Sequence, residues 1–306
     1  MVDKLAKIWM DGKLVDWDDA NVHILTHTLH YGMGVFEGIR CYETVDGRGA
    51  IFRLDAHIKR LLGSAHIFTM KSPYGQAEIE RATIDLLKAN KLTDCYIRPL
   101  IYLGDGAMGL YPAGNPIRLA IIAWRWGAYL GEEGLAQGIR MKTSSFTRHH
   151  PNNVMVKAKA TGMYINSILA KMEVKACGYD EALLMDTEGC VSEASGENVF
   201  IVQDGAIYTP DDVSILKGIT RDAVFRIAKD LGVRIEAKRI TRDEVYLADE
   251  AFLTGTAAEV TPIRELDGRA IGAGARGPIT KRIQDAFFDI VKGKDARYKE
   301  WLTYLP

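Results

Sequence analysis

Two Asp-Gly pairs, each set between apolar runs, limit most strongly what this chain can fold into. They are Asp11-Gly12 and Asp204-Gly205. An Asp-Gly pair readily forms the two-residue turn that joins neighbouring antiparallel strands. The flanking runs are Lys7–Met10, Leu14-Val15, Asn198–Val202 and Ala206–Tyr208. The sequence therefore predicts a β-hairpin near the N-terminus and a second one in the later half.

Four apolar stripes with helical spacing lie between the strand-like runs. Apolar residues three and four positions apart form one face of a helix. We expect Asp55 to cap the first of these helices. The stripes are Ile58/Leu61/Leu62/Ala65, Ile165/Ile168/Leu169/Met172, Val224/Ile227/Ala228/Leu231 and Ile279/Ile283/Ala286/Phe287/Ile290. Because strands and helices do not alternate regularly, the pattern predicts an α+β fold with largely antiparallel sheets.

The length of 306 residues favours two domains. A glycine-rich segment, Trp126–Gly134, follows the apolar run Leu119–Trp124, which suits a buried strand. We therefore expect residues 1–126 to form a smaller N-terminal α/β domain and 127–136 an interdomain loop. Residues 137–306 would form a larger C-terminal α/β domain that carries the candidate lysine described below.

Composition excludes several classes of function. The formal net charge of −1 gives no general attraction to nucleic acid or to an anionic membrane. No apolar run approaches the roughly 20 residues of a membrane helix, and no signal peptide is expected. The four cysteines, Cys41, Cys95, Cys177 and Cys190, form no CxxC pair. We therefore expect no metal site, and scattered thiols fit a cytoplasmic protein.

A glycine motif, Gly104–Gly109, matches the GxGxxG pattern of dinucleotide-binding proteins after the strand-like run Tyr96–Leu103. Such a site requires a helix to begin at the glycines, so that its N-terminus holds the pyrophosphate. Leu110–Pro112 and Gly114–Pro116 follow instead, and their prolines and glycine break helices. The motif therefore predicts a flexible loop.

Two lysines are candidates for a nucleophilic amine. Val154–Lys159 has the pattern of a strand, and a helix is expected from about Thr161 to Lys175. A lysine at a strand end in apolar surroundings has a lowered pKa, which frees its amine to attack an aldehyde. Alternation places Lys157 and Lys159 on the same face of the predicted strand, so periodicity does not choose between them.

A possible acid lies in the segment Cys190–Asn198, between two strand-like runs. A carboxylate beside the pyridine nitrogen of a cofactor keeps that nitrogen protonated, and the pyridinium accepts electrons from a substrate carbanion. The segment offers Glu193 and Glu197 for this role. Taken alone, two glutamates beside a glycine fit a solvated turn better.

Two loops of small residues have the composition of an anion site. Gly218 allows a tight turn before the third predicted helix, whose first amides, those of Ile219 and Thr220, would point outward with the helix dipole behind them. Gly255–Ala258 is a second such loop and adds the Thr256 hydroxyl. Each segment is equally consistent with an ordinary loop.

Together these segments closely resemble the branched-chain-amino-acid aminotransferase family, which uses pyridoxal 5′-phosphate (PLP) and has PLP fold type IV. The resemblance runs from about Ile8 to Phe288. The matching segments, in the order of the family, are His30–Arg40, Tyr96–Leu100, Trp126–Tyr129, Lys159–Tyr164, Ser192–Asn198, Gly218–Arg221 and Gly255–Glu259. The resemblance implies a two-domain α+β fold with the active site at the domain interface.

The resemblance also implies roles at the matching positions. Lys159 would bind the cofactor covalently and move a proton, Glu193 would pair with the pyridine nitrogen, and Tyr164 would hydrogen-bond the phenolic oxygen. The residues implied to bind the cofactor phosphate are Arg60, Ile219, Thr220 and Thr256. Arg60 lies nearly opposite the first apolar stripe, so periodicity alone predicts that it is exposed to solvent.

A mainly apolar substrate pocket is implied in the same way, and it suits a branched aliphatic side chain. Its implied members are Tyr31, Phe36, Gly38, Tyr96, Arg98, Met108, Leu110, Trp126, Tyr129, Ala257 and Ala258. Arg98, with Tyr31 nearby, would contact the distal carboxylate of glutamate. The amides of Ala257 and Ala258 would also serve carboxylates.

The implied reaction is ping-pong transfer of the amino group of L-leucine, L-isoleucine or L-valine to 2-oxoglutarate. The implied assembly is a homodimer or a dimer-based hexamer. A D-amino-acid or (R)-amine transaminase is the nearest alternative, but Tyr31–Arg40 follows the branched-chain pattern. Trp126 and Met108 do not favour an aminodeoxychorismate lyase, and a non-catalytic binding protein has no need of the lysine and acid together. Ala160–Met163 departs from the two glycines and asparagine frequent in the family.

Overall fold

The computed structural model describes residues 4–127 and 129–306. Ala128, part of the Trp126–Tyr129 motif, and residues 1–3 lie outside the described residues. The chain forms two compact units. The first contains Met1–Trp126, Ala158–Met163 and Ile290–Pro306, and the second contains Gly127–Lys157 and Tyr164–Asp289. Lys159 therefore belongs to the first unit, whereas the sequence placed it in a C-terminal domain; the domain bounds of the sequence analysis stay a prediction.

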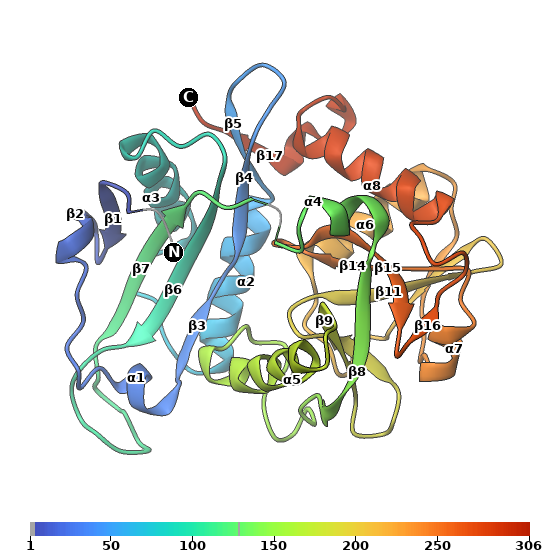
Figure 1. The fold of residues 1–306 in the computed structure, drawn as a ribbon. Coiled ribbons are helices and arrows are strands. Elements are labelled where there is room, and N and C mark those ends of the chain that lie inside the picture. The colour runs from blue at the N-terminus through green and yellow to red at the C-terminus, as the bar shows by residue number, and fades with distance from the viewer. Residues whose placement is uncertain (1–3, 128) are drawn as a thin grey trace. The chain divides into compact units, whose positions relative to one another are not determined.

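An eight-stranded sheet with antiparallel pairings forms the centre of the first unit. Its order is β17-β5-β4-β6-β7-β1-β2, with β3 paired to β6. The strands are β1 (Lys7–Met10), β2 (Lys13–Asp16), β3 (Gly34–Phe36), β4 (Ile39–Glu43), β5 (Gly49–Phe52), β6 (Cys95–Leu103), β7 (Ile117–Trp124) and β17 (Leu302–Tyr304). Helices α2 (Leu54–Ile67) and α3 (Gln76–Ala89) pack against each other and against this sheet (Figure 1). The short elements are α1 (His27–Tyr31), η1 (Trp17–Asp19), η2 (Thr161–Met163) and η3 (Ala296–Trp301).

Local sequence determines much of this unit. The predicted hairpin is confirmed, with β1 paired to β2 and with Asp11 and Gly12 at φ values of 49° and 93°. The segment from Gly104 to Pro116 joins β6 to β7 without a helix, which confirms that the GxGxxG match is a loop. The predicted cap of α2 is wrong, because Arg53 precedes the helix with a φ of 52° and Asp55 lies in its first turn.

The second unit contains a nine-stranded mixed sheet of order β10-β9-β8-β15-β14-β11-β12-β13, with β16 paired to β15. Its strands are β8 (Ile139–Thr147), β9 (Glu181–Met185), β10 (Val191–Ala194), β11 (Asn198–Gln203), β12 (Ala206–Thr209), β13 (Ile235–Ala237), β14 (Glu250–Gly255), β15 (Glu259–Leu266) and β16 (Arg269–Ala270). Its helices are α4 (Glu132–Gln137), α5 (Tyr164–Ala176), α6 (Ile219–Asp230), α7 (Arg242–Tyr246) and α8 (Pro278–Val291). The parallel pairs are β8/β9, β8/β15 and β12/β13. The predicted α+β class and the hairpin around Asp204-Gly205 are both confirmed.

The apolar stripes of this unit behave differently from one another. Those of α6 and α8 are largely buried, as the exposures of Ile227 (1%) and Ile283 (0%) show. The stripe of α5 faces solvent, with Ile165 and Met172 each 64% exposed. The buried side of α5 consists of Ser167, Ala170 and Val174, and this side packs on β8 and β9. Helical spacing thus predicted the helix without showing which face is covered.

The predicted strand over Val154–Lys159 is wrong. Turns and bends occupy this segment, and only Ala160 forms an isolated bridge, with Val35. The argument that Lys157 and Lys159 share a strand face therefore fails. In the described part of the chain, no helix combines the length and the apolar character needed to cross a membrane.

Candidate active site

The two candidate lysines have different surroundings. Lys159 is fixed through its backbone, since its carbonyl accepts a hydrogen bond from the Phe36 amide at 3.0 Å and its amide donates to the Ser64 hydroxyl at 3.1 Å. Its Nζ lies 5.1 Å from the centre of the Phe36 ring. The Nζ of Lys157 donates to the carbonyl oxygen of Asp212 and, at 2.9 Å, to that of Ile215. Burial lowers the pKa of Lys157, but its amine is held by a loop, and the geometry favours Lys159 as the nucleophile.

A buried carboxylate fixes Arg60 in the first unit. Glu37 is 0% exposed and accepts hydrogen bonds from Arg60 Nε at 2.6 Å, Arg60 Nη2 at 2.9 Å and His57 Nδ1 at 2.7 Å. Burial raises the pKa of Glu37, but Arg60 and His57 outweigh burial and hold that pKa well below its usual range. Burial lowers the pKa of His57, so its Nδ1–H donates from a neutral ring. The Arg60 side chain is only 16% exposed, which corrects the expectation from periodicity.

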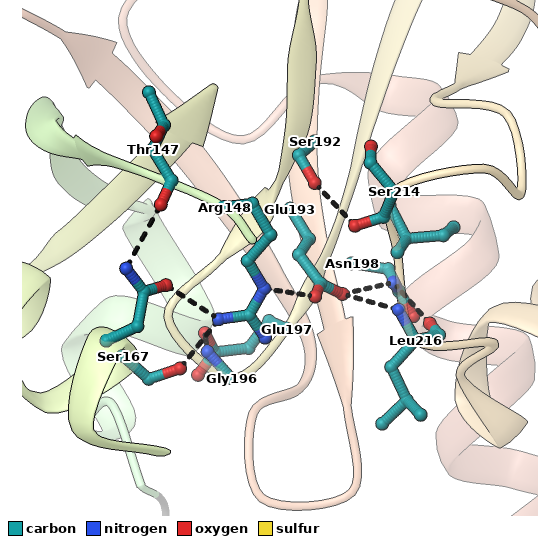
Figure 2. A network of polar contacts seen from close by, with 12 residues as sticks. Thr147, Arg148, Ser167, Ser192, Glu193, Gly196, Glu197, Asn198, Ser214 and Leu216 are labelled. Carbon is teal, nitrogen blue, oxygen red and sulfur yellow. Dashed lines mark hydrogen bonds and ion pairs between the residues drawn. The ribbon is translucent and has the colours of Figure 1, made fainter. Parts of the chain in front are cut away.

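Glu193 is the centre of a polar network in the second unit (Figure 2). It lies on β10 with its side chain 5% exposed. Its Oε1 accepts from Arg148 Nε at 2.8 Å, while its Oε2 accepts from Asn198 Nδ2 at 3.3 Å and from the Leu216 amide at 3.2 Å. Arg148 Nη1 also donates to the Ser167 hydroxyl at 2.9 Å. The network fixes a buried carboxylate in one orientation.

Glu197 differs from Glu193 in its position and partners. It precedes β11, and its Oε2 accepts from the Gly196 amide at 3.0 Å. Arg148 was missed by the sequence analysis, because nothing in the sequence around Arg148 indicates that its side chain reaches β10. A buried glutamate without a local cation predicts only that some distant cation must pair with it.

The N-terminus of α6 has the form of an anion site. Ile219 and Thr220 open a helix of 12 residues whose N-cap is Gly218. The φ of Gly218, −67°, is open to any residue, so the backbone conformation itself does not require glycine there. A Cβ atom there would instead come within 2.0 Å of Asn198 Oδ1. Asn198 thus requires glycine before α6, and its amide also donates to the Leu216 carbonyl at 3.0 Å, which joins the Glu193 network to this helix start.

The second predicted anion loop is a three-residue turn, Thr256–Ala258, between β14 and β15. Ala258 is 2% exposed, and its carbonyl accepts from the Thr261 hydroxyl at 2.6 Å. Gly255 lies close to Glu197, because a Cβ on this glycine would contact Glu197 Cγ at 3.4 Å. The turn is therefore a fixed, partly buried element, as a binding loop requires.

Arg98 lies within an aromatic cage in the first unit. Its guanidinium carbon is 4.6 Å from the ring centre of Phe36, 5.4 Å from that of Tyr96 and 5.6 Å from that of Trp124. The Trp126 ring meets the Tyr96 ring edge-on at 4.7 Å. Trp124 is a member that the sequence analysis did not name. Arginine surrounded by ring faces keeps its donors in a fixed direction.

Gly38 lies against the Tyr96 side chain of this cage, with no space for a larger residue. A Cβ there would come within 1.8 Å of the Tyr96 hydroxyl. Other predicted substrate residues of the first unit do not join the cage: Tyr31 is 46%, Met108 42% and Leu110 91% exposed. The remaining predicted substrate residues, Tyr129, Ala257 and Ala258, belong to the second unit, as does the predicted cofactor ligand Tyr164.

The chain is similar to known proteins along nearly its whole length. Residues 34–266 match the model of the amino-transferase class IV family. The branched-chain-amino-acid aminotransferase of Pseudomonas aeruginosa is 56% identical over 99% of this chain and 98% of its own. The chain belongs to the branched-chain-amino-acid aminotransferase family. This confirms the predicted resemblance.

Solved structures of this family share the fold. The crystal structure of the T.th. branched-chain amino acid aminotransferase with pyridoxamine 5′-phosphate has a TM-score of 0.97 and 48% identity, with all of both chains covered. A second structure of the T.th. enzyme, complexed with N-(5′-phosphopyridoxyl)-L-glutamate, has a TM-score of 0.94 and 46% identity over all of both chains. The predicted α+β fold of class IV aminotransferases is confirmed.

The residues of this chain fit the cofactor of the family on structural grounds. A pyridine ring that must stay protonated requires a buried carboxylate held as an anion, and Glu193 is ion-paired at 5% exposure. A phosphate requires backbone amides at a helix start, and α6 supplies those of Ile219 and Thr220. The aldehyde requires an amine on a fixed backbone, and Lys159 is fixed by Phe36 and Ser64.

Proposed function

We propose that this chain is a PLP-dependent transaminase that exchanges the amino group between L-leucine, L-isoleucine or L-valine and 2-oxoglutarate. Branched-chain amino acid transamination follows from membership of the family. The single observation that carries the assignment of the site is the Glu193 network, which holds a buried carboxylate next to the start of α6. The two T.th. complexes, with pyridoxamine phosphate and with a phosphopyridoxyl glutamate, support the same cofactor and the same acceptor chemistry.

The proposed roles follow from the geometry of each side chain. PLP, when bound, supplies an electron sink for the carbanion at the substrate α-carbon. Lys159 would hold the cofactor covalently, and its Nζ, when free, would move the α-proton of the substrate. Glu193 holds the proton at the pyridine nitrogen. Arg60, Ile219, Thr220 and Thr256 bind the phosphate, and Tyr164 donates to the phenolic oxygen.

The proposed substrate pocket combines apolar walls with few polar groups. Phe36, Tyr96 and Trp126 form walls that accept a branched side chain without offering it hydrogen bonds. Arg98, with Tyr31, binds the distal carboxylate of glutamate. The other proposed members are Gly38, Met108, Leu110, Tyr129 and the amides of Ala257 and Ala258.

A substrate panel tests this proposal. Purified holoenzyme is incubated with 2-oxoglutarate and, separately, the three branched L-amino acids, D-alanine and an (R)-amine, and glutamate formation is measured. We expect rapid formation with the L-amino acids alone. Faster turnover of D-alanine or the (R)-amine would instead support the alternative transaminase.

The proposed functional unit is a homodimer or a dimer-based hexamer. The exposed apolar face of α5, which includes Ile165, Ile168 and Met172, supports it, because solvated apolar stripes of this kind usually mark an interface. Leu110 and Tyr111, at 91% and 86% exposure, add a second apolar surface. Sedimentation of the active enzyme tests this, and an active monomer would contradict it. A cytoplasmic location is part of the same proposal, in line with four free cysteines.

A further inference from the structure

A polar cavity of about 350 Å³ lies wholly within the second unit, and none of the proposed roles uses it. Lys142 of β8, Arg242 of α7 and Arg269 of β16 contribute its cations. Asp267, in the turn between β15 and β16, and the phenols Tyr179 and Tyr246 complete most of its wall. Figure 1 shows α7 and β16 at the same edge of this unit. Residues from four separate parts of the sequence thus meet around one cavity.

The single carboxylate of this cavity already has its own donors. Asp267 Oδ1 accepts from the Thr143 amide at 2.7 Å, and Oδ2 accepts from the Thr143 hydroxyl at 2.6 Å and from the Tyr246 hydroxyl at 2.7 Å. Burial raises the pKa of Asp267, but these hydrogen bonds outweigh burial and keep it below its usual value. Asp267 is therefore an anion whose oxygens accept hydrogen bonds from neutral groups, and Lys142 acts on it only through a weaker attraction without a hydrogen bond.

The three cations have no carboxylate within ion-pair distance in residues 4–127 and 129–306. Cations on neighbouring elements do pair: Arg140 lies 3.0 Å from Glu265, and Lys238 lies 2.6 Å from Glu244. Arg269 instead donates to the Asp267 carbonyl at 3.2 Å and covers the Tyr246 ring at 4.7 Å. Three cations and one carboxylate line the cavity, so its lining carries a net positive charge. Glu173 and Asp243, outside the lining, attract Lys142 and Arg242 from beyond ion-pair distance.

We propose that this cavity binds a small dianion, a phosphate group or a dicarboxylate, through Lys142, Arg242 and Arg269. The planar arginine groups match both kinds of anion, and charge-assisted hydrogen bonds are stronger than neutral ones. A dianion balances the excess charge. Since the cations come from β8, α7 and β16, the bound anion links three elements and stabilises the second unit.

Calorimetric titration of the cofactor-loaded enzyme tests the site. Inorganic phosphate and succinate are titrated separately at constant ionic strength set with chloride, because the loaded enzyme already has its cofactor phosphate in place. We expect saturable binding of at least one anion, with a matching rise in the melting temperature. Phosphate alone would identify a phosphate site, and succinate alone a dicarboxylate site.

The variant Lys142→Ala/Arg242→Ala should weaken that binding about a hundredfold or more, because it removes two charge-assisted bonds that each contribute about tenfold. Arg242→Glu, at an exposed position, should abolish it without a risk to folding. The matched control is Lys281→Ala, which removes an exposed cation of α8 that pairs with Asp285. Equal weakening in the control, or no saturable binding of either anion to the native sequence, would overturn the proposal.

Discussion

In each unit of this protein a buried glutamate pairs with an arginine, and the two pairs differ in how far the arginine side chain is exposed. Glu37 is 0% exposed while the Arg60 side chain is 16% exposed. Glu193 and Arg148 are both nearly buried, at 5% and 10%. In the first unit the carboxylate is inside and the guanidinium lies nearer the surface.

The hydrogen bonds that the two glutamates accept also differ, in number and in length. Glu37 takes three short bonds, of 2.6 to 2.9 Å, from Arg60 and His57. Glu193 takes one short bond from Arg148, and its Oε2 has only longer ones, of 3.2 and 3.3 Å. Arg148 meanwhile donates elsewhere, to Ser167. These contacts fit the proposed roles, in which Arg60 binds an anion and Glu193 faces a cation.

Lys159→Ala should have the largest effect, because both pairs are proposed to serve a cofactor that Lys159 holds. Loss of its proton transfer alone should lower kcat roughly 10²–10⁴-fold. Lys157→Ala is the control and should keep most activity, since Lys157 Nζ is bound by loop carbonyls. Borohydride reduction and peptide mapping of the native enzyme check the assignment. A pyridoxyl group found on Lys157 would show that it is wrong.

Glu193→Gln tests the second pair. The neutral amide cannot hold a proton on the pyridine nitrogen, so turnover should fall by orders of magnitude while the cofactor still binds. Glu197→Gln is the matched control, because Glu197 is equally buried, at 5%, but contacts the Gly196 amide. Steady-state kinetics and the visible spectrum measure both. Normal turnover in the Glu193 variant would remove this carboxylate from the mechanism.

The sequence predicted the parts of these sites that depend on local order. The start of α6 and the Thr256–Ala258 turn follow from residues that are neighbours in the chain. Arg148 and Trp124 were missed, because their contacts with Glu193 and Arg98 join distant segments.

The errors have physical causes as well. The apolar alternation of Val154, Val156 and Ala158 is typical of a strand, but this segment consists of turns and bends. Lys157 instead donates to the backbone carbonyls of Asp212 and Ile215. The family resemblance predicted that Arg60 binds a phosphate. The side chain of Arg60 is largely buried because it pairs with Glu37, and helical periodicity cannot predict a contact with a residue outside the helix.

Glu37→Gln tests the first pair and should have a smaller effect on turnover than Glu193→Gln. Loss of the anion loosens Arg60 and should weaken cofactor binding about tenfold, and it should destabilise the fold by about 3–5 kcal/mol because the largely buried Arg60 guanidinium loses its partner. Equilibrium dialysis and urea unfolding measure the two effects. Unchanged cofactor affinity would show that Arg60 needs no carboxylate to hold it.

The pH dependence of that difference has a definite sign. The pKa of Glu37 is lower in the folded chain than its unfolded value of about 4.3, so its stabilisation is complete above that pH. The stabilisation is lost as the pH falls towards the folded pKa. The gap in unfolding free energy between the native sequence and Glu37→Gln should therefore narrow as the pH is lowered from about 5 to about 3. A gap that widens would contradict the ion-pair account.

Ser167→Ala should have the smallest effect, and it tests whether the Ser167 hydroxyl holds Arg148 in place beside Glu193. The Ser167 hydroxyl, on the buried face of α5, accepts from Arg148 Nη1 at 2.9 Å. Its loss removes one hydrogen bond to a charged group, about 1.5–3 kcal/mol of stability. Arg148 can then shift relative to Glu193 Oε1, so the pH dependence of the cofactor absorption band should move while the KM for leucine stays constant.

The matched control is Thr83→Ala, which removes another buried hydroxyl on a helix; the Thr83 hydroxyl donates to the Ile79 carbonyl of its own helix at 2.8 Å. It should cost some stability and leave the absorption band unchanged. An equal spectral response in both variants would show that Ser167 acts through packing alone. The Ser167 hydrogen bond would then not be needed to hold Arg148 beside Glu193.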